Sequence, residues 1–209
     1  MILNLLSENP LLFVAWIVAI LMAVSVHEFA HAAMAYYLGD STAKDAGRLT
    51  LNPLAHLDLV GTLLLLFVGF GWGKPVPFNP LNLRDKKWGS TFVSLAGPGA
   101  NLVCLIFFGL ILRFVYPLLG LGIENALFHF LYLLILINTV LMIFNLIPIP
   151  PLDGSELLLT ILPDSMLEFK MMLRQWGIFI LLALVFLGGS ILVSLFQFFS
   201  SLIDKLFIV

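Results

Sequence analysis

Charge is scarce in this chain, where 10 lysines and arginines and 12 aspartates and glutamates make up only 11% of the 209 residues. A soluble domain needs roughly a quarter of its residues charged to cover its surface. Hydrophobic residues, in contrast, reach 61% of the total. The composition therefore excludes an ordinary soluble domain and indicates that lipid is the solvent for most of the chain.

Cysteine is almost missing too, because Cys104 is the only one and an intrachain disulfide is excluded. The net charge of −2 gives no sign of a nucleic-acid partner. Internal repeats, low-complexity tracts and a soluble appendage are absent from the sequence. We therefore expect residues 1–209 to form a single membrane-embedded domain in the cell membrane, with the lipid bilayer as its main partner and an oligomeric state that the sequence leaves open.

Uncharged runs locate the membrane spans, since a helix needs about 20 apolar residues to cross ~30 Å of hydrocarbon. Sufficient runs lie within residues 10–38, 91–115, 125–147 and 175–203. The run at 59–73 is short and rich in glycine, so we expect it to be re-entrant or interfacial. The last run forms one helix, or two that divide at Gly188 and Gly189. We predict an all-α integral membrane protein, a bundle of about 4–6 transmembrane helices.

The first span contains the sequence HEFAH at residues 27–31. His27 and His31 lie one helical turn apart on the same face, where they can hold one metal ion. Glu28 lies beside them and can take a proton from a water on that metal, because zinc lowers the pKa of such a water toward ~7. Ionisable residues within a span are costly and usually functional, which favours a metal site over a chance match.

A third ligand is needed, because catalytic zinc usually has three protein ligands and a water. Asp153 is the best candidate, since it follows a long uncharged run and lies in an apolar segment broken by prolines. Irregular backbone at membrane depth is tolerated where it lines a cavity or is buried in protein. Alternatively, Asp153 caps a helix and forms a capping box with Glu156. The spacing alone leaves both interpretations open.

Three patterns together resemble the site-2 protease family of intramembrane zinc metalloproteases, and most closely its small members without PDZ or CBS domains. The patterns are HEFAH in a span, Ala96-Gly97-Pro98-Gly99-Ala100-Asn101 at the start of a later span, and NLIPIPPLDG at residues 145–154. The resemblance implies that His27, His31 and Asp153 hold Zn²⁺. It further implies that Glu28 is the general base and that Asn145 holds the substrate backbone or the oxyanion.

The resemblance also implies a function, the hydrolysis of peptide bonds in the transmembrane segments of membrane-protein substrates near the cytoplasmic face. One alternative is a metal-binding transporter, but the chain lacks the paired broken helices that such a protein needs. Another is a catalytically inactive scaffold that binds helices. The intact Glu28 argues against the scaffold.

The metal site constrains the topology. HEFAH lies near the C-terminal end of its helix, and Asp153 follows the C-terminal end of the span at 125–147, so both ends must face one side. This arrangement requires that the run at 59–73 does not cross the membrane. The excess of basic residues within 74–87 predicts that this side is cytoplasmic.

Four further polar residues have two interpretations each. In the first interpretation, His56 and Asp58 form a gate or a second layer around the metal. In the second, they belong to an interfacial turn that begins at residues 52–53, and the pattern favours this interpretation. Asn138 and Asn145 are seven residues apart and share a helix face. They line the substrate groove, or they join helices by hydrogen bonds in lipid.

Overall fold

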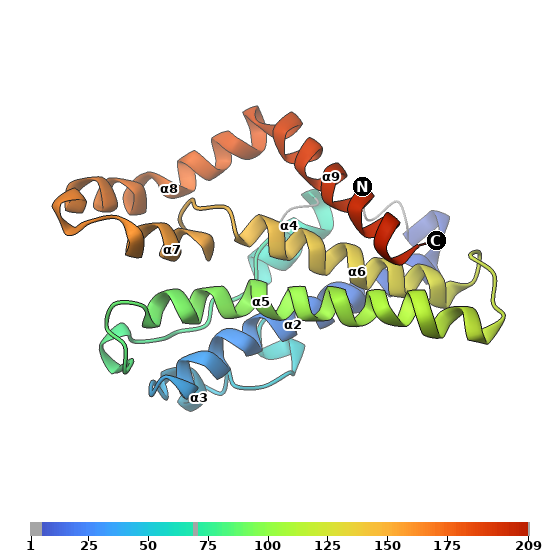
Figure 1. Ribbon diagram of the computed structural model, residues 1–209, viewed down its shortest axis with the longest axis horizontal. Coiled ribbons are helices and arrows are strands. Elements are labelled where there is room, and N and C mark those ends of the chain that lie inside the picture. The colour runs from blue at the N-terminus through green and yellow to red at the C-terminus, as the bar shows by residue number, and fades with distance from the viewer. Residues whose placement is uncertain (1–5, 69–70, 209) are drawn as a thin grey trace.

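The structure is a computed structural model that describes residues 6–68 and 71–208, in which every regular element is helical (Figure 1). The helices are α2 (Pro10–Tyr37), α3 (Thr42–Asp45), α4 (Leu59–Val68), α5 (Gly89–Leu110), α6 (Ala126–Asn145), α7 (Gly154–Ile161), α8 (Leu167–Leu187) and α9 (Gly189–Phe207). Within the described residues, 5 helices are long and apolar enough to cross a membrane: α2, α5, α6, α8 and α9. The predicted all-α membrane bundle is therefore confirmed.

The centre of the bundle is formed by α2, α5 and α6, which pack against one another. Figure 1 shows α5 running antiparallel to α2 and α6. The C-terminal ends of α2 and α6 therefore lie at the same end of the bundle as the start of α5. This end, which we call the site end, is where the sequence places HEFAH and Asp153.

The ends of the long helices follow from capping residues. The side chain of Asn9 accepts a backbone N–H from the first turn of α2, and Pro10 occupies a first-turn position that needs no N–H donor. Gly39 follows the end of α2 with a φ of 105°, a conformation that favours glycine. Asn125 caps α6 in the same way as Asn9 caps α2. The bounds of α2 and α6 agree with the predicted spans to within two residues, whereas α5 ends at Leu110, five residues before the end predicted for its span.

The short helix α4 is the expected re-entrant or interfacial segment. Its 10 residues extend only about 15 Å, half the hydrocarbon thickness. The chain then returns to its starting point, because Gly73 forms an antiparallel bridge with Leu57. A Cβ atom on Gly61 would lie 2.1 Å from the carbonyl oxygen of Trp72, so only glycine allows this tight return. The segment consequently adds no crossing between α2 and α5.

A buried carboxylate joins the loops at the site end. Asp40 is 0% exposed. It accepts hydrogen bonds from the backbone N–H of Asn79 at 2.7 Å, the amide of Asn82 at 2.8 Å and the hydroxyl of Thr42 at 2.6 Å. Burial by itself would raise the pKa of Asp40, but these donors outweigh it and lower the pKa below its ordinary value. The ionised carboxylate thus holds the segment before α5 against the end of α2.

The last apolar run forms two helices, α8 and α9, which divide at Gly188. The hydroxyl of Tyr132 on α6 donates to Asp204 on α9 at 3.3 Å, so the end of α9 lies far from the site end. Near the site end, α8 packs against the loop after α6. A Cβ atom on the buried Gly177 would lie only 2.4 Å from the carbonyl oxygen of Pro150.

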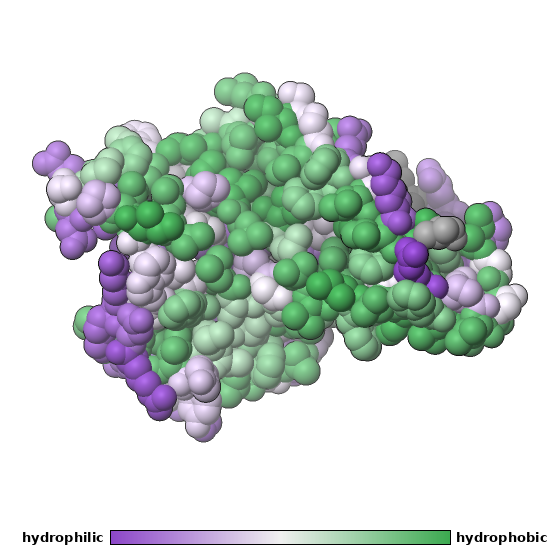
Figure 2. Space-filling view, viewed as in Figure 1, coloured by the Kyte–Doolittle hydropathy of each residue, from purple (hydrophilic) through white to green (hydrophobic). Residues whose placement is uncertain are grey.

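The surface is that of a protein in a bilayer. Figure 2 shows apolar side chains across the middle of this face, and hydrophilic side chains gathered towards its two ends. Large apolar side chains are exposed along the spanning helices, among them Phe107, Phe186 and Leu187. Such a broad apolar surface is unusual for a soluble monomer and is expected where lipid replaces water.

Candidate metal centre

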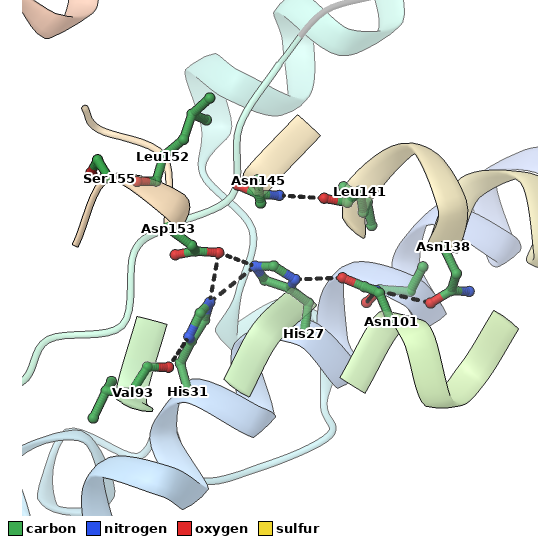
Figure 3. A network of polar contacts seen from close by, with 11 residues as sticks. His27, His31, Val93, Asn101, Asn138, Leu141, Asn145, Leu152, Asp153 and Ser155 are labelled. Atoms are coloured by element: carbon green, nitrogen blue, oxygen red, sulfur yellow. Dashed lines mark hydrogen bonds and ion pairs between the residues drawn. The ribbon is translucent and has the colours of Figure 1, made fainter. Parts of the chain in front are cut away.

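The two histidines of HEFAH lie side by side inside the bundle. His27 and His31 are 6% and 7% exposed, and their Nε2 atoms are 3.0 Å apart. Both side chains project from the face of α2 that packs against α5 (Figure 3). The four-residue spacing therefore brings two nitrogen ligands to one point, as the sequence predicts.

The other nitrogen of each ring is used for orientation. His31 Nδ1 lies 2.7 Å from the carbonyl oxygen of Val93 on α5, and His27 Nδ1 lies 2.6 Å from Oδ1 of Asn101. A carbonyl oxygen can only accept, so His31 Nδ1 carries the proton, and in the neutral ring Nε2 keeps a free lone pair. Fixing the ring in this way is the usual arrangement for a histidine that binds a metal.

Asp153 completes a cluster of three. Its Oδ2 lies 3.2 Å from His27 Nε2 and 3.4 Å from His31 Nε2. This oxygen is buried and has no hydrogen-bond partner among the described residues. In the part of the chain that the structure covers, the Asp153 side chain makes no capping hydrogen bond to α7. The geometry thus favours the ligand interpretation over the helix cap.

The loop before Asp153 is folded tightly back on the end of α6. A Cβ atom on Gly154 would lie 2.3 Å from the carbonyl oxygen of Leu146, so a larger residue there would open the turn. The prolines of this segment include a cis Pro150–Pro151 bond, and they prevent α6 from continuing. The turn places Asp153 level with HEFAH, although 122 and 126 residues separate the aspartate from His31 and His27 in the numbering.

The three atoms fit a zinc ion. Their separations are 3.0, 3.2 and 3.4 Å, and tetrahedral zinc with bonds of ~2.0–2.1 Å places its ligand atoms ~3.3 Å apart. Two nitrogen lone pairs and a carboxylate oxygen repel one another at such distances unless a proton or a metal ion lies among them, and a zinc ion would relieve the repulsion of all three at once. The donor set, two imidazoles and a carboxylate, is one that catalytic zinc uses.

Glycine at position 97 leaves room for this cluster. A Cβ atom on Gly97 would lie 2.4 Å from His31 Nε2 and 2.6 Å from His27 Cε1. The glycine therefore allows α5 to approach the two imidazole rings. Pro98 is the next residue of the helix. A Cβ atom on Gly99 would be directed away from the cluster, since it would have no neighbour within 4 Å among the described residues beyond the adjoining helix.

Glu28 lies on the side of α2 that faces the segment returning from α4. Its side chain is half-buried. A Cβ atom on Gly73 would lie 3.6 Å from Glu28 Oε1, an ordinary contact distance, so the returning segment passes directly beside this carboxylate. Glu28 is thus adjacent to the histidines on the helix without joining the cluster of ligand atoms.

The two asparagines of α6 have different environments. Asn145 is half-buried and donates one amide N–H to the carbonyl oxygen of Leu141 at 3.0 Å, which leaves a second N–H on the same nitrogen (Figure 3). Asn138 is only 1% exposed and bonds to Asn101 on α5. Asn138 therefore joins helices, whereas a role for Asn145 in holding substrate stays a prediction.

His56 and Asp58 belong to the turn that precedes α4. His56 is 0% exposed, its Nε2 lies 2.7 Å from the carbonyl oxygen of Thr50, and Arg48 approaches its Nδ1 at 3.4 Å. Asp58 accepts the backbone N–H of Gly61 at 2.8 Å. These contacts favour the interpretation as a structural turn.

A helical membrane bundle in which an HExxH pair meets a distant aspartate is the arrangement of a membrane-embedded zinc metalloprotease. Residues 15–184 match peptidase family M50. The chain belongs to this family, the site-2 protease family, which confirms the resemblance, the enzyme class and zinc as the cofactor.

The matching relatives are named as candidate zinc metalloproteases. YwhC of Bacillus subtilis (strain 168) is 38% identical over 181 residues, which cover 84% of this chain and 83% of YwhC. Rip2 of Mycolicibacterium smegmatis is 32% identical over 183 residues, or 83% of this chain and 67% of Rip2. Rip2 of Mycobacterium tuberculosis strain H37Rv is 31% identical over 148 residues, or 68% of this chain and 55% of that protein. No solved structure matches this chain.

Proposed function

We propose that this protein is an intramembrane endopeptidase that cleaves transmembrane segments of other membrane proteins near the cytoplasmic face, and that residues 1–209 act as one domain. The observation that carries the proposal is the convergence of His27 Nε2, His31 Nε2 and Asp153 Oδ2 within 3.4 Å inside a bundle of spanning helices. We assign these three side chains as the zinc ligands. A protease site at this depth is suited to substrates that are themselves in the membrane.

The roles of the remaining residues follow from their positions. Zinc, when bound, supplies Lewis-acid chemistry that polarises a carbonyl group and acidifies water. Glu28 takes the proton from the attacking water and passes it to the leaving amine. The second N–H of Asn145 is available to hold a substrate carbonyl. The substrate segment must unwind first, because a helix uses each internal peptide group in its own hydrogen bonds.

Replacing Glu28 by glutamine tests the catalytic assignment. The amide keeps the shape of the side chain but cannot accept the proton, so we expect peptide cleavage to fall by about 10²–10⁴-fold. Zinc content should be unchanged, because Glu28 is not one of the three clustered ligands. Both quantities are measured on purified protein, with a transmembrane substrate in proteoliposomes.

The matched control for this variant is Glu124→Gln, which changes an exposed carboxylate just before α6, at the end opposite the site. It should cleave at the parental rate. Unchanged cleavage by Glu28→Gln would reject Glu28 as the general base. A parent that transports metal ions but cleaves no peptide would support the transporter instead.

The distribution of basic residues supports a cytoplasmic site. Eight of the 10 lysines and arginines lie at the site end of the bundle, and the two at the other end are Arg113 and Lys205. The eight are Lys44, Arg48, Lys74, Arg84, Lys86, Lys87, Lys170 and Arg174. Loops rich in lysine and arginine stay on the cytoplasmic side of a membrane.

Cysteine labelling tests this orientation. The single native cysteine is first removed by Cys104→Ala, and one cysteine is then introduced as Ser41→Cys, Ser90→Cys or Glu124→Cys. We expect a membrane-impermeant thiol reagent to label position 124 in intact cells, and positions 41 and 90 only after the membrane is opened. Labelling of 41 and 90 from outside would place the site on the other face, and labelling of these two from opposite sides would contradict the fold.

A further inference from the structure

The two histidines are oriented by different means. His31 Nδ1 bonds directly to a backbone carbonyl oxygen, that of Val93. His27 Nδ1 instead meets the side-chain amide of Asn101, and an amide has both an accepting and a donating end. An amide that reversed would present N–H to His27 Nδ1. The ring proton would then have to move to Nε2, the atom that faces the other ligands.

Backbone carbonyls further along the chain of contacts prevent this reversal. Asn138 Nδ2 donates to the carbonyl oxygen of Leu134 at 2.8 Å, which leaves Asn138 Oδ1 as an acceptor. Asn101 Nδ2 donates to that Oδ1 at 2.8 Å and approaches the carbonyl oxygen of Ala23 at 3.5 Å. Because carbonyl oxygens only accept, the direction of every bond is determined, and Asn101 Oδ1 must face His27.

We propose that the buried pair Asn101–Asn138 is a positioning unit that sets the tautomer of His27 and so keeps its Nε2 lone pair available for zinc. The inference rests on the zinc site proposed above. The unit connects α2, α5 and α6, because Asn101 bonds to His27 and approaches Ala23 on α2 while Asn138 belongs to α6 (Figure 3). Through these hydrogen bonds, a carbonyl oxygen on α6 determines which ring nitrogen of a histidine on α2 carries the proton.

Burial restricts the two asparagines to one arrangement of hydrogen bonds. Asn101 and Asn138 are 0% and 1% exposed, so water does not offer the amides another set of partners. A buried amide left without a partner is costly, and the arrangement that satisfies all groups is therefore strongly preferred. Helix packing alone would also explain two asparagines in lipid, but packing predicts an effect on folding rather than on the affinity for zinc.

The test measures the zinc dissociation constant of the purified full-length protein by competition with a chelator of known affinity. Asn101→Leu removes the acceptor for His27, and Asn138→Leu removes the group that holds Asn101 in its orientation. We expect each change to weaken zinc binding by about 10–100-fold, as for other partners of metal-binding histidines. Asn101→Asp keeps an oxygen opposite His27 Nδ1 and should bind zinc within a few-fold of the parent.

Thr139→Val is the matched control, because Thr139 is equally buried on α6 and its hydroxyl donates to Ile135. It should leave zinc affinity unchanged. The double variant Asn101→Leu with Asn138→Leu should be no weaker than Asn101→Leu alone, since both act through one bond to His27. Thermal unfolding of the metal-free proteins separately measures what the packing of the asparagines contributes to the stability of the fold.

Equal zinc affinity in the parent, Asn101→Leu and Asn138→Leu, with lower thermal stability in the variants, would overturn the inference. If Asn101→Leu does not fold, the comparison of Asn138→Leu with Asn101→Asp decides. The inference expects weaker zinc binding in Asn138→Leu than in Asn101→Asp, and the same zinc affinity in both variants would overturn it. Nitrogen-15 histidine spectra of metal-free protein should show the His27 proton on Nδ1 in the parent and a shift towards Nε2 in Asn138→Leu. A parent without zinc affinity would reject the proposed metal site itself, which is a distinct result.

Discussion

Asp153→Ala should release zinc. We expect about one zinc per chain in the parent, and an affinity lower by at least about 100-fold in the variant, since a charged ligand is removed from a set of three. Two neutral histidines would remain, and neither supplies the negative charge of the carboxylate. Metal analysis of protein purified with zinc present, followed by chelator competition, measures both quantities.

Asp164→Ala is the control for this experiment. Asp164 is also a carboxylate of the C-terminal half, but its side chain is fully exposed and lies 3.4 Å from Lys170. It should bind zinc as the parent does. If Asp153→Ala keeps the full zinc content and affinity, Asp153 is not a ligand, and the helix cap would become the better interpretation of this residue.

Gly97→Ala should disable the site without changing any polar residue. The added Cβ would lie 2.4 Å from His31 Nε2, far inside contact distance, and in contact with the ring of His27. Either the imidazole rings or α5 must move, and both movements separate the ligand atoms. We expect zinc affinity and peptide cleavage each to fall by about 100-fold or more, because errors of 1 Å are costly at a catalytic site.

Gly99→Ala provides a close comparison, since it makes the same change two residues along the same helix, at a place where no described atom outside the adjoining helix lies within 4 Å of the new Cβ. Alanine is the better helix former, so stability should be equal or slightly higher. Parental zinc affinity in Gly97→Ala would mean that α5 lies farther from the histidines than the structure places it. Loss of affinity in both variants would indicate a general sensitivity of α5.

The spans and the close approach of His27 and His31 were predictable because their signals are local. A helix of 28 residues that contains HEFAH is recognised from uncharged length and from a spacing of four. The re-entrant nature of α4 was also predictable, since its run is short and the two C-terminal ends had to meet. For α2 one stretch of chain carries the whole signal, whereas for α4 the short run had to be combined with the requirement that two distant helix ends meet.

The surroundings of the ligands were not predictable in the same way. The contact between His27 and Asn101 joins residues 74 positions apart, and no spacing rule relates them. Asn101 was visible only as part of a family pattern, and Asn138 as one polar residue in an apolar helix. The available signal was the cost of an amide in lipid, which says that a partner exists but does not identify it.

The contact between Gly177 and Pro150 determines how much of the chain the zinc site requires. The proposed ligands lie within residues 27–153, but the loop that carries the last of them contacts α8 through Gly177 and Pro150. A chain that ended after α7 would retain the three proposed ligands, Glu28 and both asparagines of the positioning unit, and yet the contact of α8 with the loop before Asp153 would be missing. We therefore expect the smallest unit that holds the metal firmly to be longer than the motifs suggest and to include α8, and a search restricted to those motifs would accept fragments that lack this support.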